Sequence, residues 1–123
     1  MGKDEQQETE IGYKIVSLRE GEQLWSYTSW VSYPVRYGKF WTRPPIGCGP
    51  LSVFKTKAAV EFFLVFEGAT PEPDVHSFKC LYVKSAEDSI WRLDGPFKLR
   101  SRRELFPIGT VLADAVKLLE KVG

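Results

Sequence analysis

The feature that most constrains the fold is one segment with helical periodicity, set among segments with strand character. In residues 57–66, KAAVEFFLVF, four apolar side chains fall at i, i+3, i+4 and i+7: Ala59, Phe62, Phe63 and Phe66. Thr56 precedes this segment and is a residue type that commonly caps helix N-termini. The spacing predicts one amphipathic helix over 57–66 with those four side chains on its buried face.

The flanking segments alternate apolar and polar side chains, or are rich in β-branched and aromatic residues, which is typical of β-strands. The ranges with this character are 11–20, 24–33, 35–41, 51–54, 77–86 and 90–95. Glu20-Gly21-Glu22 separates the first two ranges and predicts a turn, so we expect these two strands to pair as a hairpin. Residues 42–50 are expected to form a loop, and residues 96–104 a polar, basic stretch.

The C-terminal residues 109–123 fit two patterns. Leu112, Leu119 and Val122 match helical spacing, whereas Thr110-Val111-Leu112 opens like a strand, so we expect a strand-like start that runs into irregular or helical structure. Strands around one clear helix predict an α+β fold, with an antiparallel or mixed sheet of five to seven short strands and the helix on one face. Residues 1–10 read as a flexible polar tail, and residues 11–123 as a single domain.

Composition limits the classes of function. The chain has 123 residues, with 17 Lys and Arg against 16 Asp and Glu, so it lacks the basic surplus usual in nucleic-acid-binding proteins. Two cysteines and one histidine cannot supply the four ligands of a structural zinc site. No cofactor motif is present. The N-terminus has no signal-peptide core, and the nearly apolar residues 58–66 are too few to span a bilayer. We therefore expect a soluble cytoplasmic protein without a membrane partner.

The loop at 42–50 contains residue types that occur at reactive sites. Gly47-Cys48-Gly49 provides a GxG pattern, but Pro50 removes a backbone donor and no helix starts there, so a phosphate cradle is disfavoured. Cys48 would need a nearby base to act as a nucleophile, and His76 is the only histidine. The loop is interpreted first as a stiff connection.

Two mixtures of aromatic and basic residues are the strongest candidates for binding. The residues expected to bind are Trp41, Arg43, Trp91, Arg92, Arg100, Arg102 and Arg103. The leading hypothesis is a non-enzymatic binding or accessory domain that contacts a protein partner, or its own copy, through this aromatic and arginine surface. One alternative is a nucleic-acid-binding module that uses Lys98 to Arg103 and the nearby aromatics. Another is a small transferase or hydrolase with a cleft near residues 40–50, lined by Arg43, Cys48 and an acid.

Four segments carry a resemblance to other proteins: GYKIVSLREGEQLWS, GPLSVFKTKAAVEFF, IWRLDGP and LFPIGTVLADAVKLLE. In this order they resemble a group of small microbial and phage-borne α+β proteins of unknown function. The resemblance implies no activity and no catalytic residue. The layout is also loosely similar to the split β-fold of ADP-ribosyltransferases, which use a catalytic glutamate. Arg100-Ser101 and Glu104 are out of register with that pattern, so no residue is carried over.

Overall fold

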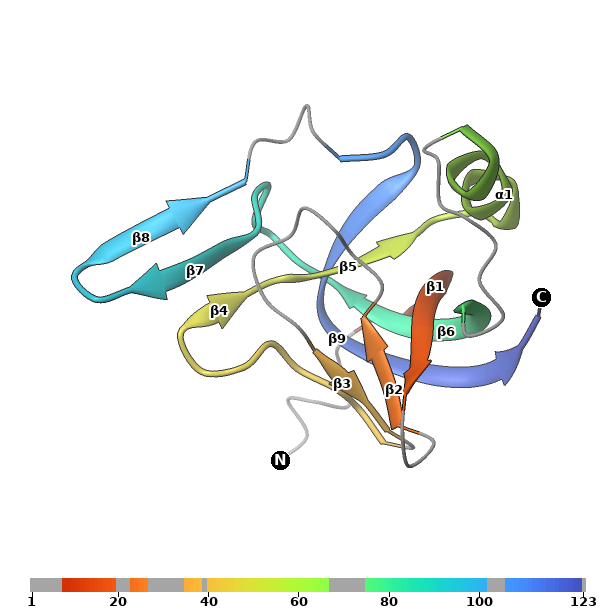
Figure 1. The fold of residues 1–123 in the computed structure, drawn as a ribbon, viewed down its shortest axis with the longest axis horizontal. Coiled ribbons are helices and arrows are strands. Elements are labelled where there is room, and N and C mark those ends of the chain that lie inside the picture. The colour runs from red at the N-terminus through yellow and green to blue at the C-terminus, as the bar shows by residue number, and fades with distance from the viewer. Residues whose placement is uncertain are drawn as a thin grey trace.

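The computed structural model describes residues 8–19, 23–26, 35–38, 40–66, 75–101 and 106–122. The elements within them are β1 (Glu10–Arg19), β2 (Gln23–Ser26), β3 (Arg36–Tyr37), β4 (Cys48–Gly49), β5 (Leu51–Phe54), α1 (Lys57–Phe66), β6 (Val75–Lys84), β7 (Trp91–Asp94), β8 (Phe97–Arg100) and β9 (Thr110–Lys121) (Figure 1). The predicted hairpin between the first two strands is confirmed for Gln23–Ser26, which pairs antiparallel with the end of β1. The later part of the predicted second strand, residues 27–33, lies outside the described residues.

Four of the strands close into a β-barrel. One edge of β1 pairs with β6, and its other edge meets β5 at Tyr13 and Phe54. The start of β9 pairs with β5 and the remainder of β9 pairs with β6, which completes the ring β1-β5-β9-β6. Strands β2 and β3 extend the sheet from the end of β1. The predicted α+β class is therefore wrong: the fold is a β-barrel that carries one helix.

The C-terminal segment is a strand over its full length rather than partly helical. Strand β9 hydrogen-bonds to β5 through Thr110 to Ala113 and to β6 through Ala113 to Lys121. Leu112 and Ala113 are both buried, as are Ala115 and Val116. A strand covered on both faces does not alternate cleanly between apolar and polar side chains. This two-sided burial produced the apparent helical spacing in the sequence.

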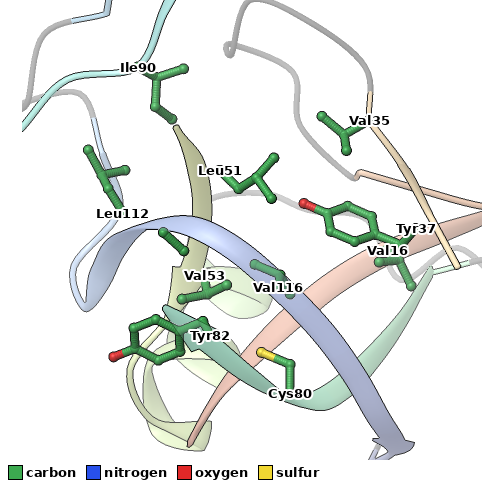
Figure 2. Close-up of a cluster of buried hydrophobic side chains, with 11 residues drawn as sticks. Val16, Val35, Tyr37, Leu51, Val53, Cys80, Tyr82, Ile90, Leu112 and Val116 are labelled. Carbon is green, nitrogen blue, oxygen red and sulfur yellow. The ribbon is translucent and has the colours of Figure 1, made fainter. Parts of the chain in front are cut away.

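The buried core is filled by aliphatic side chains and the rings of Tyr37 and Tyr82 (Figure 2). Val16, Cys80 and Val116 are fully buried in it. The ring of Tyr82 lies across Gly12, where an added Cβ would come within 2.8 Å of Tyr82 Cε1. The Tyr82 hydroxyl donates a hydrogen bond to Glu10 Oε1 at 3.2 Å. Gly12 is thus required by the close approach of β1 to the tyrosine ring on β6.

Helix α1 covers the outside of the barrel over β1 and β5. Its predicted boundaries are confirmed, and the Ala59 amide donates to the Thr56 hydroxyl at 3.1 Å, as expected of an N-cap. Among the helix side chains that the structure describes, Ala59, Val60 and Phe63 are buried. Phe62 is 41% exposed, so its predicted burial is wrong, and the Phe66 side chain lies outside the described residues. The helix packs on Ile15 of β1, and Phe54 of β5 and Val75 of β6 pack against the same cluster.

Strands β4, β7 and β8 form a second, three-stranded sheet whose β7-β8 hairpin projects from the barrel (Figure 1). Strand β4 lies within residues 42–50, which were expected to be only a loop. Strand β8 lies within residues 96–104, which were expected to be a polar stretch. Strand β4, with two residues, is too short for alternation to reveal it, whereas the alternation in β8 spans only four residues. Within the described residues, no helix is long and apolar enough to cross a membrane.

Candidate functional site

The β7-β8 hairpin has two faces with different chemistry. Trp91 lies opposite Arg100, Arg92 opposite Leu99, Leu93 opposite Lys98, and Asp94 opposite Phe97. Gly95, whose φ of 62° falls in the left-handed region, takes the first position of the two-residue turn, as such tight turns require. Side chains of a strand alternate between faces, and directly opposed residues share one. We call the side that carries Lys98 and Arg100 the basic face and the side that carries Phe97 and Leu99 the apolar face.

The basic face carries Trp91, Leu93, Lys98 and Arg100. The Trp91 ring lies against Gly49 of β4, where an added Cβ would be 3.2 Å from the ring, and its Nε1 donates to Glu87 Oε1 at 2.8 Å. The Lys98 ammonium lies 4.3 Å from the centroid of the indole, a cation–π arrangement. Arg100 donates to the Ser89 hydroxyl at 2.9 Å. These contacts hold two cations in fixed places beside a half-buried tryptophan.

The apolar face carries Arg92, Asp94, Phe97 and Leu99, next to Cys48 of β4. Phe97 is 68% exposed and Leu99 is 41% exposed, although both are large hydrophobic residues. The Nε of Arg92 is buried and has no hydrogen-bond partner among the described residues. All four residues of β8 are exposed, so this strand packs against little besides β7.

The structure brings only some of the predicted binding residues together. Trp91 and Arg100 are cross-strand neighbours on the basic face, whereas Arg92 points to the other face. Trp41 and Arg43 are both exposed and flank Thr42, whose backbone exchanges two hydrogen bonds with Val116 of β9 (2.8 and 2.9 Å). Two further predicted residues, Arg102 and Arg103, lie outside the described residues.

Sequence reasoning counted Phe97 only among the aromatics near the basic stretch and did not single out Leu99, although both side chains are exposed. Phe97 and Leu99 alternate with Lys98 and Arg100, which is the period of a strand with one apolar face. The segment is only four residues long and follows Pro96, and its charges led to its interpretation as a polar stretch. The apolar positions between the charges were the available signal.

Cys48 lacks the surroundings of a reactive thiol. Desolvation by burial raises the pKa of the Cys48 thiol, and the nearby Arg92 opposes this only in part. A nucleophilic cysteine needs a lowered pKa, because the thiolate is the reactive form. His76 lies in the barrel opposite Val16, whereas Cys48 belongs to the three-stranded sheet. Among the residues that the structure describes, no group of three His, Cys, Asp or Glu side chains could hold a metal ion.

A cleft at residues 40–50 was the expectation for an enzyme. A cavity of about 350 Å³ lies instead between α1 and strands β1 and β6. A smaller one, of about 100 Å³, borders the turn at residues 84–88 and the start of β9. Residues 40–50 line neither cavity. The loop that carries Arg43 and Cys48 therefore does not contribute to either of these concave sites.

Lys14 is a buried cation that the sequence did not single out. Its side chain is 6% exposed and points into the barrel, where Nζ donates to the Ser52 carbonyl at 2.6 Å and lies 5.3 Å from the centroid of the Tyr37 ring. Burial lowers the pKa of Lys14 to about 8, and the nearby Cys80 opposes this shift. The ammonium supplies a donor to a β5 carbonyl close to the point where pairing between β1 and β5 stops, which indicates a structural role.

The chain matches no protein-family model, no curated protein and no solved structure. The resemblance to small microbial and phage-borne proteins therefore stays a prediction. Any assignment of function rests on the geometry of the sheet formed by β4, β7 and β8.

Proposed function

We propose that this chain is a non-enzymatic protein-binding module, in which the barrel holds the β4-β7-β8 sheet as the contact surface. The observation that carries the proposal is the exposure of Phe97 and Leu99 on a hairpin that projects from the barrel. Clustered exposed hydrophobic side chains on a soluble domain commonly mark interaction sites.

The composition of the surface supports a protein partner. Trp91, Arg92 and Arg100 are residue types that dominate the binding energy of protein interfaces. Arg92 shares the apolar face with Phe97 and Leu99, and the other two lie on the basic face of the same hairpin. Strand β8 is also the edge of its sheet. An exposed apolar edge strand can pair with other chains and aggregate unless it is covered, so a bound partner would protect this edge.

The hairpin is held firmly enough to serve as a preformed surface. The Ser101 amide donates to the Ile90 carbonyl at 2.7 Å at the base of the hairpin, and the Leu93 amide donates to Gly47 of the β4 turn at 2.8 Å. The hydrogen bond from Trp91 to Glu87 fixes the base of β7 as well. A partner would therefore meet an ordered surface, which lowers the entropic cost of binding.

The proposal is tested by affinity capture from a lysate of the source cells with three versions of the full chain. These are the unaltered chain, the double variant Phe97→Ser/Leu99→Ser, and the control Val65→Ser/Ile108→Ser. The control removes two apolar side chains that are 70% and 73% exposed elsewhere on the surface. We expect a discrete protein to be retained by the unaltered chain and the control and lost from the hairpin variant. Equal retention by all three would refute the proposal.

A further inference from the structure

We propose that the partner binds by strand addition: an extended segment with alternating acidic and apolar side chains pairs with the open edge of β8. This inference rests on the proposed protein-binding function and names its mode and the chemistry of the partner. It is carried by the direction of the β8 backbone groups and by the pattern of side chains along that strand.

The backbone of β8 presents hydrogen-bonding groups at its outer edge. Opposed residues in an antiparallel ladder alternate between hydrogen-bonded and non-hydrogen-bonded pairs, and residues of the second kind direct their amide and carbonyl groups away from the partner strand. Ser101 and Ile90 form a bonded pair, so Arg100 and Lys98, one and three residues earlier, direct their amide and carbonyl groups away from β7. The Leu93 amide, opposite Lys98, donates to Gly47 on the β4 side, as this alternation requires. No described residue pairs with the outer edge of β8.

The side chains along β8 specify what an added strand should carry. Lys98 and Arg100 place two exposed cations on the basic face, while Phe97 and Leu99 place two exposed apolar side chains on the other face. Side chains of an added strand would alternate between the same two faces. Acidic residues opposite the cations and apolar residues opposite Phe97 and Leu99 give the complementary pattern, because opposite charges in cross-strand positions are favourable.

The same pattern disfavours a second copy of this chain as the added strand. In antiparallel self-pairing, the outward-directed residues Lys98 and Arg100 must pair with each other or with themselves. Every such register places one cation directly opposite another, which is destabilising. An acidic segment of a different protein therefore fits this edge better than β8 of another copy.

The experiment uses the full chain and a synthetic seven-residue peptide of alternating valine and glutamate. Peptide binding is followed by NMR titration and by hydrogen exchange of individual amides. We expect the peptide to slow exchange of the Lys98 and Arg100 amides, while the Leu99 amide, already directed toward β7, changes little. A peptide of alternating valine and lysine should not bind. A valine–glutamate peptide N-methylated at the positions that face β8 should bind at least about tenfold more weakly, because it cannot donate to the strand.

Variants of the protein separate charge from backbone pairing. Lys98→Glu/Arg100→Glu should weaken peptide binding by about tenfold or more, since two favourable cross-strand pairs become repulsive. The control Lys55→Glu/Lys84→Glu changes two exposed lysines outside the hairpin and should leave binding unchanged. Lys98→Pro removes an outward N–H at an edge position that tolerates proline and should bind more weakly than Lys98→Gln.

The outcomes distinguish this inference from the proposed function. If the N-methylated peptide binds as tightly as its parent, or the Lys98 and Arg100 amides stay unprotected, strand addition is wrong. Protein capture that depends on Phe97 would still support the proposed function in that case. If single-stranded DNA rather than the peptide perturbs these residues, or if the chain dimerises through β8 instead, the acidic-segment assignment is overturned. Failure of the unmodified valine–glutamate peptide to bind also overturns it.

Discussion

The buried lysine in the barrel gives a quantitative prediction. A pKa lowered from 10.5 to about 8 for Lys14 means that the fold disfavours its charged form by about 3 kcal/mol, at about 1.4 kcal/mol per pH unit. Because the unfolded chain binds this proton more tightly, the penalty is present at low pH. It is relieved as the pH rises from about 8 toward 10.5. Lys14 alone should raise the free energy of unfolding by roughly 1 kcal/mol between pH 7 and pH 9.

The thiol inside the barrel acts in the opposite direction. Burial raises the pKa of Cys80 from 9.0 to about 11. The folded chain therefore holds the thiol proton more tightly than the unfolded chain, and the free energy of unfolding falls as the pH rises from about 9 toward 11. By pH 9 this loss is still smaller than the gain from Lys14, which leaves a net rise of up to about 1 kcal/mol for the unaltered chain. The free energy of unfolding should then change little toward pH 10.5, where the two effects cancel, and fall at higher pH.

The perturbation is Lys14→Met, which keeps the length of the side chain and removes the charge. Urea unfolding followed by tryptophan fluorescence, under reducing conditions at pH 7, 8 and 9, gives the free energy of each chain. We expect the unaltered chain to gain about 1 kcal/mol over this range and the variant, which keeps Cys80, to lose slightly toward pH 9. The variant loses the hydrogen bond to Ser52 but also the cost of desolvating a cation, so it should be no less stable at pH 7. An equal slope in both chains, or a variant destabilised by more than about 2 kcal/mol, would refute the reasoning.

Three further predictions concern stability. Gly109 has φ of 86° and an added Cβ would lie 2.5 Å from the Ala59 Cβ, so Gly109→Ala should cost about 2–3 kcal/mol in chemical unfolding. Gly38→Ala, with nothing near the added atom, should change the free energy by less than about 0.5 kcal/mol, and an equal cost for both would contradict the account. Thr56→Ala should cost about 1 kcal/mol through loss of the N-cap, and Thr56→Ser should restore most of it; no recovery would argue against the cap. Phe97→Ser should leave the unfolding midpoint within about 0.5 kcal/mol of the unaltered chain, because Phe97 is mostly exposed, and a larger loss would mean that it packs in the fold.

The local elements were predictable because their signals lie within a few residues. The helix and its Thr56 cap, the first hairpin, and the alternation of Phe78, Cys80 and Tyr82 toward one side follow from periodicity and turn chemistry, and the structure confirms them. Closure of the barrel could not be predicted in the same way. An alternating strand looks alike in an open and a closed sheet, and the pairing of β1 with both β5 and β6 leaves no mark in spacing.

The candidate site was predictable only in its residue types. Trp91, Arg92 and Arg100 were identified from their chemistry, but their division between two faces depends on the register of β7 and β8. Phe97 was counted among the aromatics near the basic stretch, but its exposure on one face of a strand was not predicted. Exposure is a tertiary property, and an apolar residue in a short segment is expected to be buried. The buried position of Lys14 was missed for the related reason that a strand with helix on one side and barrel interior on the other has no solvent face.

The central claim is that the β7-β8 hairpin is the surface through which this chain meets another protein. Site-specific photo-crosslinking in the source cells tests it most directly, with benzoylphenylalanine placed at position 97 in one chain and at position 65 on α1 in another. Both positions are mostly exposed in the free chain. The account predicts a discrete crosslinked protein from position 97 and none from position 65. Crosslinks from position 65 alone, or the same products from both positions, would contradict it.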